Sequence, residues 1–92
     1  MSSVVVQKKI HVTGVVQGVG YRYFAYKNAH KFKIKGYARN MLDGSVLVVA
    51  QGEKAPVSNY ISLLREGPVA ASIDSVEIED CPVEEYDRFS TY

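Results

Sequence analysis

The sequence has 92 residues, of which 47% are apolar and 23% charged, and its formal net charge is +1. These values are typical of a single small globular domain. We expect that domain to span residues 1–92, with its core over about 4–92. A general nucleic-acid binder usually carries a clear basic excess, which is missing here. Any anion-binding site must therefore be local.

Cysteine usage and the N-terminal residues indicate a reduced compartment. Cys81 is the single cysteine, so no disulfide framework within the chain is available. Residues 1–9 lack the basic-then-apolar order of a signal peptide, and no apolar run approaches the roughly 18 residues that span a bilayer. We expect a cytoplasmic protein that binds no membrane, in which Cys81 is a packed or surface thiol.

The first half of the chain predicts one strand, one helix and a hairpin. Alternating apolar residues over Val4–Gly14 indicate a strand with one buried and one wetter face. Apolar residues at helical spacing predict a helix from Tyr21 to about Lys33. Two further strands, Ile34–Asn40 and Ser45–Gln51, flank Asp43-Gly44, a dipeptide typical of tight hairpin turns.

The second half predicts one more helix and one more strand. The helix runs from about Pro56, a residue favoured at the first helical position, to Glu66. The strand covers Ser72–Cys81 with Val76 and Ile78 inward, and residues 82–92 are expected to form a loop and a short edge strand. The order is β-α-β-β-α-β. This order predicts an α+β, ferredoxin-like fold, an antiparallel sheet with two helices on one face.

A glycine-rich turn between the first strand and the first helix combines three devices that bind anions. Glycines allow backbone N–H groups to converge, a helix N-terminus adds unpaired donors, and Arg22 adds a planar cation. Arg22 also opposes the helix dipole, at about 0.3–1 kcal/mol, which a bound anion would relieve. A structural turn with a solvent-facing arginine is the alternative. The turn lacks the Gly-Lys-Ser/Thr ending of a P-loop, and Tyr23 stands where a dinucleotide fingerprint needs glycine.

Two motifs in this chain resemble those of a known family. Residues 14–22, GVVQGVGYR, resemble the acylphosphatase signature G-x-V-Q-G-V-x-[FY]-R. Residues 36–46, GYARNMLDGSV, are similar to the family's second signature, G-[FYW]-[AV]-x-N-x-x-D-G-x-V. Both occur in the family's order and separation, and the likeness covers nearly the whole chain. The resemblance implies hydrolysis of the carboxylic–phosphoric anhydride bond of acyl phosphates.

The resemblance also implies roles for individual residues. Arg22 would bind the phosphoryl group, and Asn40 would hold the attacking water. The backbone N–H groups of the loop at 15–21 would cradle the phosphate oxygens, chiefly those of Val16, Gln17, Gly18, Val19, Gly20 and Tyr21. Gly14 would shape the loop, and Gln17 would brace it by hydrogen bonding, with Asn40 as a suggested contact. No metal or cofactor is implied, inorganic phosphate would be product and inhibitor, and a monomer is expected.

Alternative interpretations remain beside this one. Asn40 near a hairpin is commonly turn chemistry, although Asp43-Gly44 already supplies the turn. The chain as a whole fits a non-catalytic anion- or nucleic-acid-binding ferredoxin-like module less well, because its charge is near neutral. An acylphosphatase-like domain of a larger carbamoyl-transfer protein is disfavoured by the short chain. The remaining candidates are interpreted as structural: His11 and His30 as isolated histidines, Glu84, Glu85 and Asp87 as a solvated acidic tail, and Tyr23, Tyr26 and Tyr37 as core or partly buried aromatics.

Overall fold

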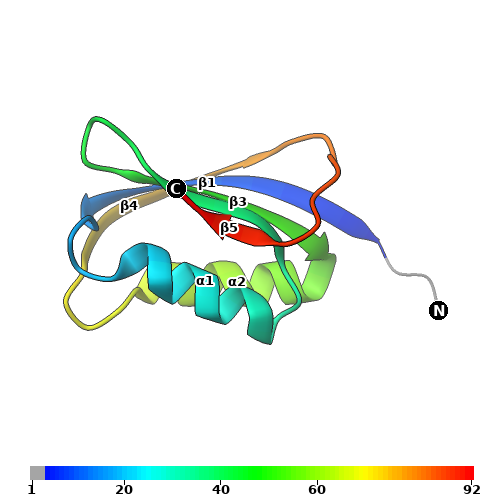
Figure 1. Ribbon diagram of the computed structural model, residues 1–92, viewed down its shortest axis with the longest axis horizontal. Helices are drawn as coiled ribbons and strands as arrows, with labels where there is room; N and C mark the ends of the chain where they lie inside the picture. Colours follow the sequence, from blue (N-terminus) through cyan, green and yellow to red (C-terminus); the bar gives the residue numbers. More distant parts are fainter. Residues whose placement is uncertain (1–3) are drawn as a thin grey trace.

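The computed structural model describes residues 4–92, which form two helices against a five-stranded sheet (Figure 1). The elements in chain order are β1 (Val5–Val15), α1 (Tyr21–Lys31), β2 (Lys35–Asn40), β3 (Val46–Glu53), α2 (Lys54–Glu66), β4 (Ser72–Asp80) and β5 (Phe89–Thr91). The predicted β-α-β-β-α-β order is confirmed, with β5 as the short additional strand. Within residues 4–92, neither helix is long and apolar enough to cross a bilayer.

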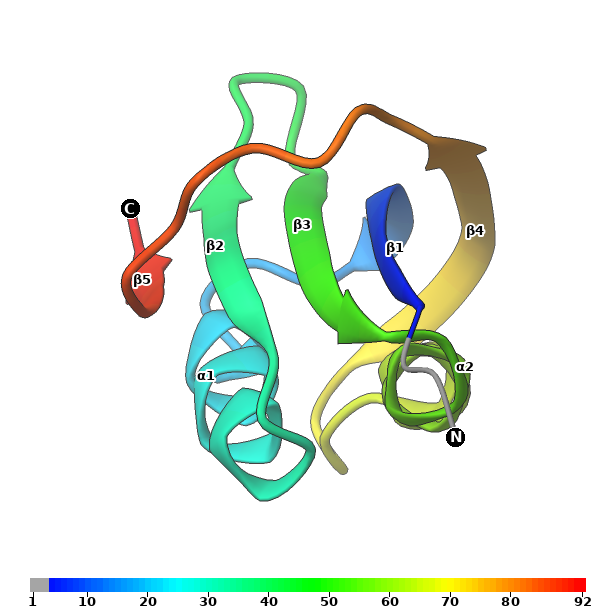
Figure 2. The same ribbon diagram turned by 90° about the vertical axis from the view of Figure 1, so that its right-hand side faces the viewer.

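The strand order in the sheet is β4-β1-β3-β2-β5. β1 pairs antiparallel with β3 and β4, and β2 pairs antiparallel with β3, as predicted. The prediction of a purely antiparallel sheet is corrected by β5, which pairs parallel with β2. The reason lies in the connection: the segment between β4 and β5 crosses the sheet face opposite the helices and reaches the other edge running in the direction of β2 (Figure 2).

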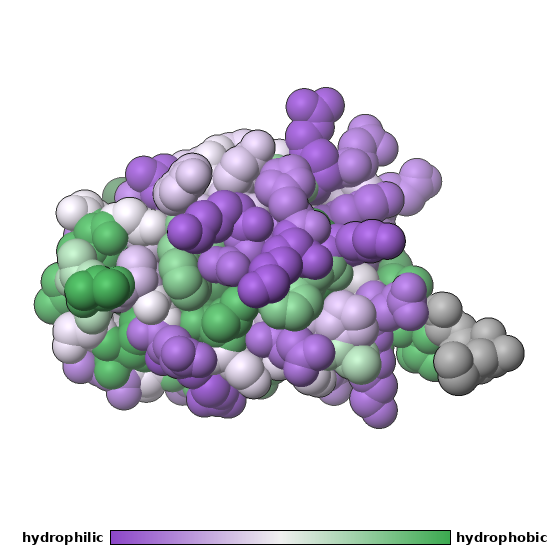
Figure 3. All heavy atoms as spheres, turned by 90° about the horizontal axis from the view of Figure 1, so that it is seen from below, coloured by the Kyte–Doolittle hydropathy of each residue, from purple (hydrophilic) through white to green (hydrophobic). Residues whose placement is uncertain are grey.

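Both helices cover one face of the sheet and enclose the core against it (Figure 2). The predicted apolar stripe of α1 is confirmed, because Tyr21, Ala25 and Ala29 are its buried residues. Val57, Tyr60, Ile61 and Leu64 are buried from α2. The solvent side of the helices mixes hydrophilic side chains with smaller hydrophobic areas (Figure 3). Burial of one face of each element is the main source of stability in a domain of this kind.

The opposite sheet face is partly covered as well. Gln7 and Gln51 lie on it and are nevertheless buried. The amide of Gln51 donates to the side-chain oxygen of Gln7 (3.0 Å) and to the backbone oxygen of Glu84, and the Glu84 N–H donates to Gln7 Oε1 (2.8 Å). These bonds hold the segment 81–88 against the sheet and satisfy the buried amides.

Two sequence expectations, one about an element end and one about a face, are corrected. The second helix begins at Lys54, so Pro56 is its third residue rather than its first. Position 56 still lies in the first turn, where no intrahelical N–H bond is lost to proline. Ile78 was expected inward but is 38% exposed. It lies near the end of β4, an edge strand with a neighbouring strand on one side only.

The close pairing of β2 and β3 requires glycine at position 36. Gly36 has φ +132°, and a Cβ there would lie 1.9 Å from the Val49 carbonyl oxygen. We expect Gly36→Ala to lower the free energy of unfolding by about 3 kcal/mol or more, through backbone strain and overpacking. Gly18→Ala is the matched control: its φ is also positive, but nothing lies within 4 Å of the added Cβ. Urea denaturation should show a loss of about 1–2 kcal/mol for the control. Equal losses would contradict the steric explanation.

Candidate active site

The turn between β1 and α1 presents a row of unpaired backbone donors. Gly18 (φ 74°) and Gly20 (φ 82°) adopt the left-handed conformation that glycine tolerates best. Within the described part of the chain, the backbone N–H groups of residues 17–21 donate to no other protein group. The helix has no side-chain N-cap and no acidic residue in its first turn. The loop and the helix N-terminus therefore offer several donors and a partial positive charge to an anion.

Arg22 stands in the first turn of α1, immediately after the buried Tyr21. The Tyr21 hydroxyl donates to the Leu64 carbonyl of α2 (2.7 Å), and burial raises the pKa of this phenol well above its usual range. This bond fixes the first turn of α1 against α2. Arg22 is half-buried, and its Nη1 donates to the backbone oxygen of Tyr92 (2.8 Å). A guanidinium has five N–H donors, so most of them remain for a ligand.

The side chain of Gln17 ties the loop to the turn between β2 and β3. Its Nε2 donates to the Met41 and Ser45 carbonyl oxygens, both at 2.8 Å. The predicted brace is therefore present, but it joins backbone oxygens of the turn rather than Asn40. Both N–H groups of the Gln17 amide are used in these bonds, one to each side of the turn. They therefore fix the orientation of the amide and hold the loop and the turn together.

Asn40 is the last residue of β2 and lies at the start of that turn. Its backbone N–H donates to the same Tyr92 oxygen that accepts from Arg22 (3.3 Å). Its side-chain Oδ1 is buried and has no hydrogen-bond partner, and it is the one such side-chain atom in the described residues. An unpaired buried acceptor costs about 1–3 kcal/mol. Such a group calls for an explanation, and a bound water that donates to it is one.

The turn itself is stabilised without the Asn40 side chain. Asp43 Oδ1 accepts from the Ser45 N–H (3.0 Å) and from the Ser45 hydroxyl. His11 Nε2 lies 2.7 Å from the same hydroxyl. The Ser45 hydroxyl, followed by its N–H, lowers the pKa of the Asp43 carboxyl. Asp43 and Gly44 thus supply the turn chemistry, and the interpretation of Asn40 as a turn residue loses its main support.

The lowered pKa of Asp43 predicts a pH-dependent contribution to stability. Because the folded pKa lies below the unfolded one, the ionised carboxylate stabilises the fold above the unfolded pKa. This contribution is lost as the pH falls through the folded pKa. Asp43→Asn keeps an oxygen acceptor but removes the charge. We expect the variant to be less stable than the unmodified chain at neutral pH and equally stable below the folded pKa, as measured by urea denaturation at both pH values.

The control for that experiment is Asp74→Asn, which alters an exposed aspartate on β4 that makes none of these bonds. It should leave stability close to that of the unmodified chain at neutral pH. A stability difference for Asp43→Asn that stays constant through the acid range would show that the charge is not responsible.

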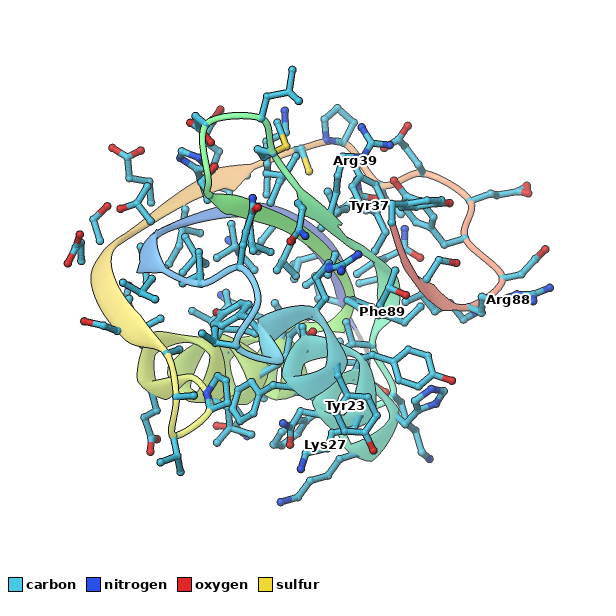
Figure 4. The ribbon with its side chains drawn as sticks, turned by 60° about the vertical axis from the view of Figure 1, so that its left-hand side comes forward. Tyr23, Lys27, Tyr37, Arg39, Arg88 and Phe89 are labelled. Atoms are coloured by element: carbon cyan, nitrogen blue, oxygen red, sulfur yellow. The ribbon has the colours of Figure 1, made fainter. Side chains whose placement is uncertain are left out.

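Other candidates from the sequence lie away from this site, with one correction. Tyr23 and Tyr26 were expected to be core or partly buried, but they are 66% and 38% exposed. Tyr23 lies on the side of α1 that faces away from the sheet, whereas Tyr37 is half-buried on β2 (Figure 4). Cys81 is half-buried, with its sulfur 3.3 Å from Gln7 Nε2. It is a packed thiol, as expected.

Fold and candidate site together define a small α+β protein in which a turn of unpaired backbone N–H groups is tied to the turn that follows Asn40, whose Oδ1 is buried. Comparison with known proteins identifies the family that this combination resembles. The acylphosphatase family model matches residues 8–91. An acylphosphatase from Pasteurella multocida is 44% identical over 91% of this chain and 94% of its own, and one from Archaeoglobus fulgidus is 40% identical over 88% and 91%. The crystal structure of acylphosphatase from Bacillus subtilis superposes with a TM-score of 0.92 at 31% identity, covering 95% of this chain and 98% of that one. The chain belongs to the acylphosphatase family.

The sequence did not indicate the backbone groups that connect the site. The Tyr92 oxygen joins Arg22 to Asn40, and the Met41 and Ser45 oxygens receive Gln17. Every residue has a backbone carbonyl, so the sequence does not indicate which of these oxygens will accept a hydrogen bond from a site residue.

Proposed function

We propose that this protein hydrolyses the carboxylic–phosphoric anhydride bond of acyl phosphates, giving a carboxylate and inorganic phosphate. The observation that carries the proposal is the combination of three groups in linked parts of the fold: the unpaired backbone N–H groups at 17–21, the Arg22 guanidinium, and the Asn40 side chain with its buried, unpartnered Oδ1. Phosphoryl transfer needs charge stabilisation and in-line positioning more than covalent chemistry. These groups supply both.

The proposed mechanism assigns binding and orientation to separate elements. The loop N–H groups and Arg22 hold the three phosphoryl oxygens and stabilise the charge of the transition state. Asn40 Oδ1 accepts a hydrogen bond from the attacking water and directs its lone pair at phosphorus. The new P–O bond forms as the bond between phosphorus and the bridging oxygen breaks. The carboxylate departs with that electron pair, and the water's proton passes to a phosphate oxygen.

No strong general base is needed in this scheme. A carboxylate is a good leaving group, so a neutral amide that orients water suffices. In the described residues no three His, Cys, Asp or Glu side chains gather as a metal site would require, and the proposal assigns no step to a metal. Inorganic phosphate, the product, should bind the same loop and inhibit.

The test is steady-state hydrolysis of benzoyl phosphate by the purified chain, with and without EDTA. We expect turnover that EDTA leaves unchanged and that added inorganic phosphate inhibits competitively. Phosphate binding without any turnover would favour a non-catalytic anion-binding module instead. Loss of activity in EDTA would contradict the metal-independent mechanism.

We further propose a monomeric, single-domain protein of the cytoplasm that binds no nucleic acid. The net charge of +1 and the single free cysteine support this assignment. Light scattering of the purified protein gives the oligomeric state directly. Binding to nucleic acid at low salt would contradict the assignment.

A further inference from the structure

A hollow of about 330 Å³ lies directly beside Arg22. Its lining comes from Arg22, Tyr23 and Tyr26 of α1 and from Thr91 of β5. The volume falls at the lower end of the range for small-molecule sites, about 300–1,000 Å³. We call this feature the tyrosine hollow. It is continuous with the proposed phosphate site because Arg22 belongs to both.

The two tyrosines contribute little to the core of the protein. Tyr23 is 66% and Tyr26 38% exposed, so burial on folding does not account for two large aromatic rings here. Each ring instead meets a side chain one turn further along α1. The Lys27 ammonium lies 5.8 Å from the Tyr23 ring centre, and the Tyr26 ring meets His30 edge-on at 4.7 Å. These contacts favour fixed positions of the two rings, and Figure 4 shows Tyr23 and Lys27 together on the outer side of α1.

The direction of the reaction places the acyl group on this side. In-line displacement puts the leaving oxygen opposite the attacking water. The water is assigned to Asn40, which lies in the sheet at the end of β2. The tyrosine hollow opens on the outward surface of α1 and β5, away from the sheet interior. An acyl group that leaves a phosphoryl group held by Arg22 therefore reaches Tyr23 and Tyr26 first.

From these observations we propose that the tyrosine hollow is the binding subsite for the acyl group, and that it selects aromatic acyl phosphates over small aliphatic ones. This proposal rests on the proposed function. An aromatic acyl group can pack on the tyrosine rings by offset stacking or edge-to-face contact. An acetyl group has no ring and gains little from them. The subsite thereby determines specificity, while the loop, Arg22 and Asn40 act on every acyl phosphate.

The test compares kcat/KM for benzoyl phosphate and acetyl phosphate in the unmodified chain and in the double variant Tyr23→Ala/Tyr26→Ala. We expect the ratio of benzoyl to acetyl phosphate kcat/KM to fall about tenfold in the variant, the size of one or two aromatic contacts. Both residues are on the helix surface, so the variant should fold normally. The ratio, unlike activity itself, does not respond to a general loss of folded enzyme.

Two further variants complete the experiment. Tyr23→Phe/Tyr26→Phe keeps the rings and should keep the ratio. Lys31→Ala, on the same helix but outside the hollow, should also leave it unchanged. If the ratio is unchanged in the double alanine variant, because kcat/KM is unaltered or falls equally for both substrates, the proposed subsite is wrong. An unmodified chain that hydrolyses neither substrate would overturn the proposed function first, and the subsite with it.

Discussion

Replacing Arg22 with alanine is expected to lower kcat/KM for benzoyl phosphate about 10³-fold or more. The guanidinium follows the loop directly in the chain, and its bond to the Tyr92 oxygen (2.8 Å) holds it in position. Its charge interacts most strongly with the phosphoryl oxygens in the transition state, so both ground-state binding and turnover should suffer. Steady-state kinetics and phosphate binding by calorimetry measure the two effects separately.

The fold should not suffer in parallel. The variant loses one exposed hydrogen bond, but it also loses a cation that opposes the helix dipole by about 0.3–1 kcal/mol. We therefore expect its urea denaturation midpoint to stay close to that of the unmodified chain.

Arg22→Lys and Arg39→Ala separate charge, geometry and position. The lysine variant keeps the charge but not the planar fork, and should recover only part of the activity. Arg39 stacks on Tyr37 and Tyr92 at 5.3 Å from each ring centre, on the outer sheet face, and its removal should leave kinetics nearly unchanged. Substantial benzoyl phosphate turnover by folded Arg22→Ala protein would refute the role assigned to Arg22.

The spacing of apolar residues predicted most of the fold, because the core lies between the helices and one face of the sheet. Val12 in β1 and Ala25 in α1 are fully buried, and both belong to stripes visible in the sequence. The parallel pairing of β5 was not predictable in the same way. A strand of three residues carries no periodic signal, and its partner is decided by the path of the segment that crosses the sheet. The same segment buries Gln7, a polar residue that the alternation placed on the wetter face.

The candidate site could be proposed from the sequence where its chemistry depends on the type and spacing of side chains. The glycines and Arg22 indicated an anion loop from physical chemistry alone, and the family resemblance added Asn40. Tyr23 and Tyr26 were misinterpreted as core or partly buried because tyrosine is, on average, at least partly buried in folded proteins. Their exposure depends on the rotation of α1 about its axis, which Ala25 and Ala29 set by occupying the buried side. The i, i+4 spacing already puts Tyr26 next to Arg22 on the predicted helix, and the structure adds that Tyr23 and Thr91 of β5 line one hollow with them.

The second large effect concerns Asn40, whose replacement by alanine should lower kcat at least about 10²–10³-fold, as for loss of a single preorganised polar group. Phosphate binding should change little, because the loop N–H groups and Arg22 remain. This split distinguishes Asn40 from Arg22: the first variant binds phosphate without turnover, whereas the second loses both. Single-turnover hydrolysis of benzoyl phosphate, together with a phosphate binding isotherm, measures the two quantities.

The free energy of unfolding of Asn40→Ala gives a second, independent test of the role of Asn40. Asn40 Oδ1 is buried without a partner, so its removal eliminates an unsatisfied acceptor and should leave the free energy of unfolding unchanged or higher. A residue that lowers stability and raises activity is typical of a functional site. Asn28→Ala is the matched control: Asn28 donates to the Phe24 oxygen within α1 (2.9 Å), so its loss should reduce stability and spare kcat. If Asn40→Ala instead unfolds more readily and keeps its kcat, Asn40 is a structural residue and the water must be oriented by another group.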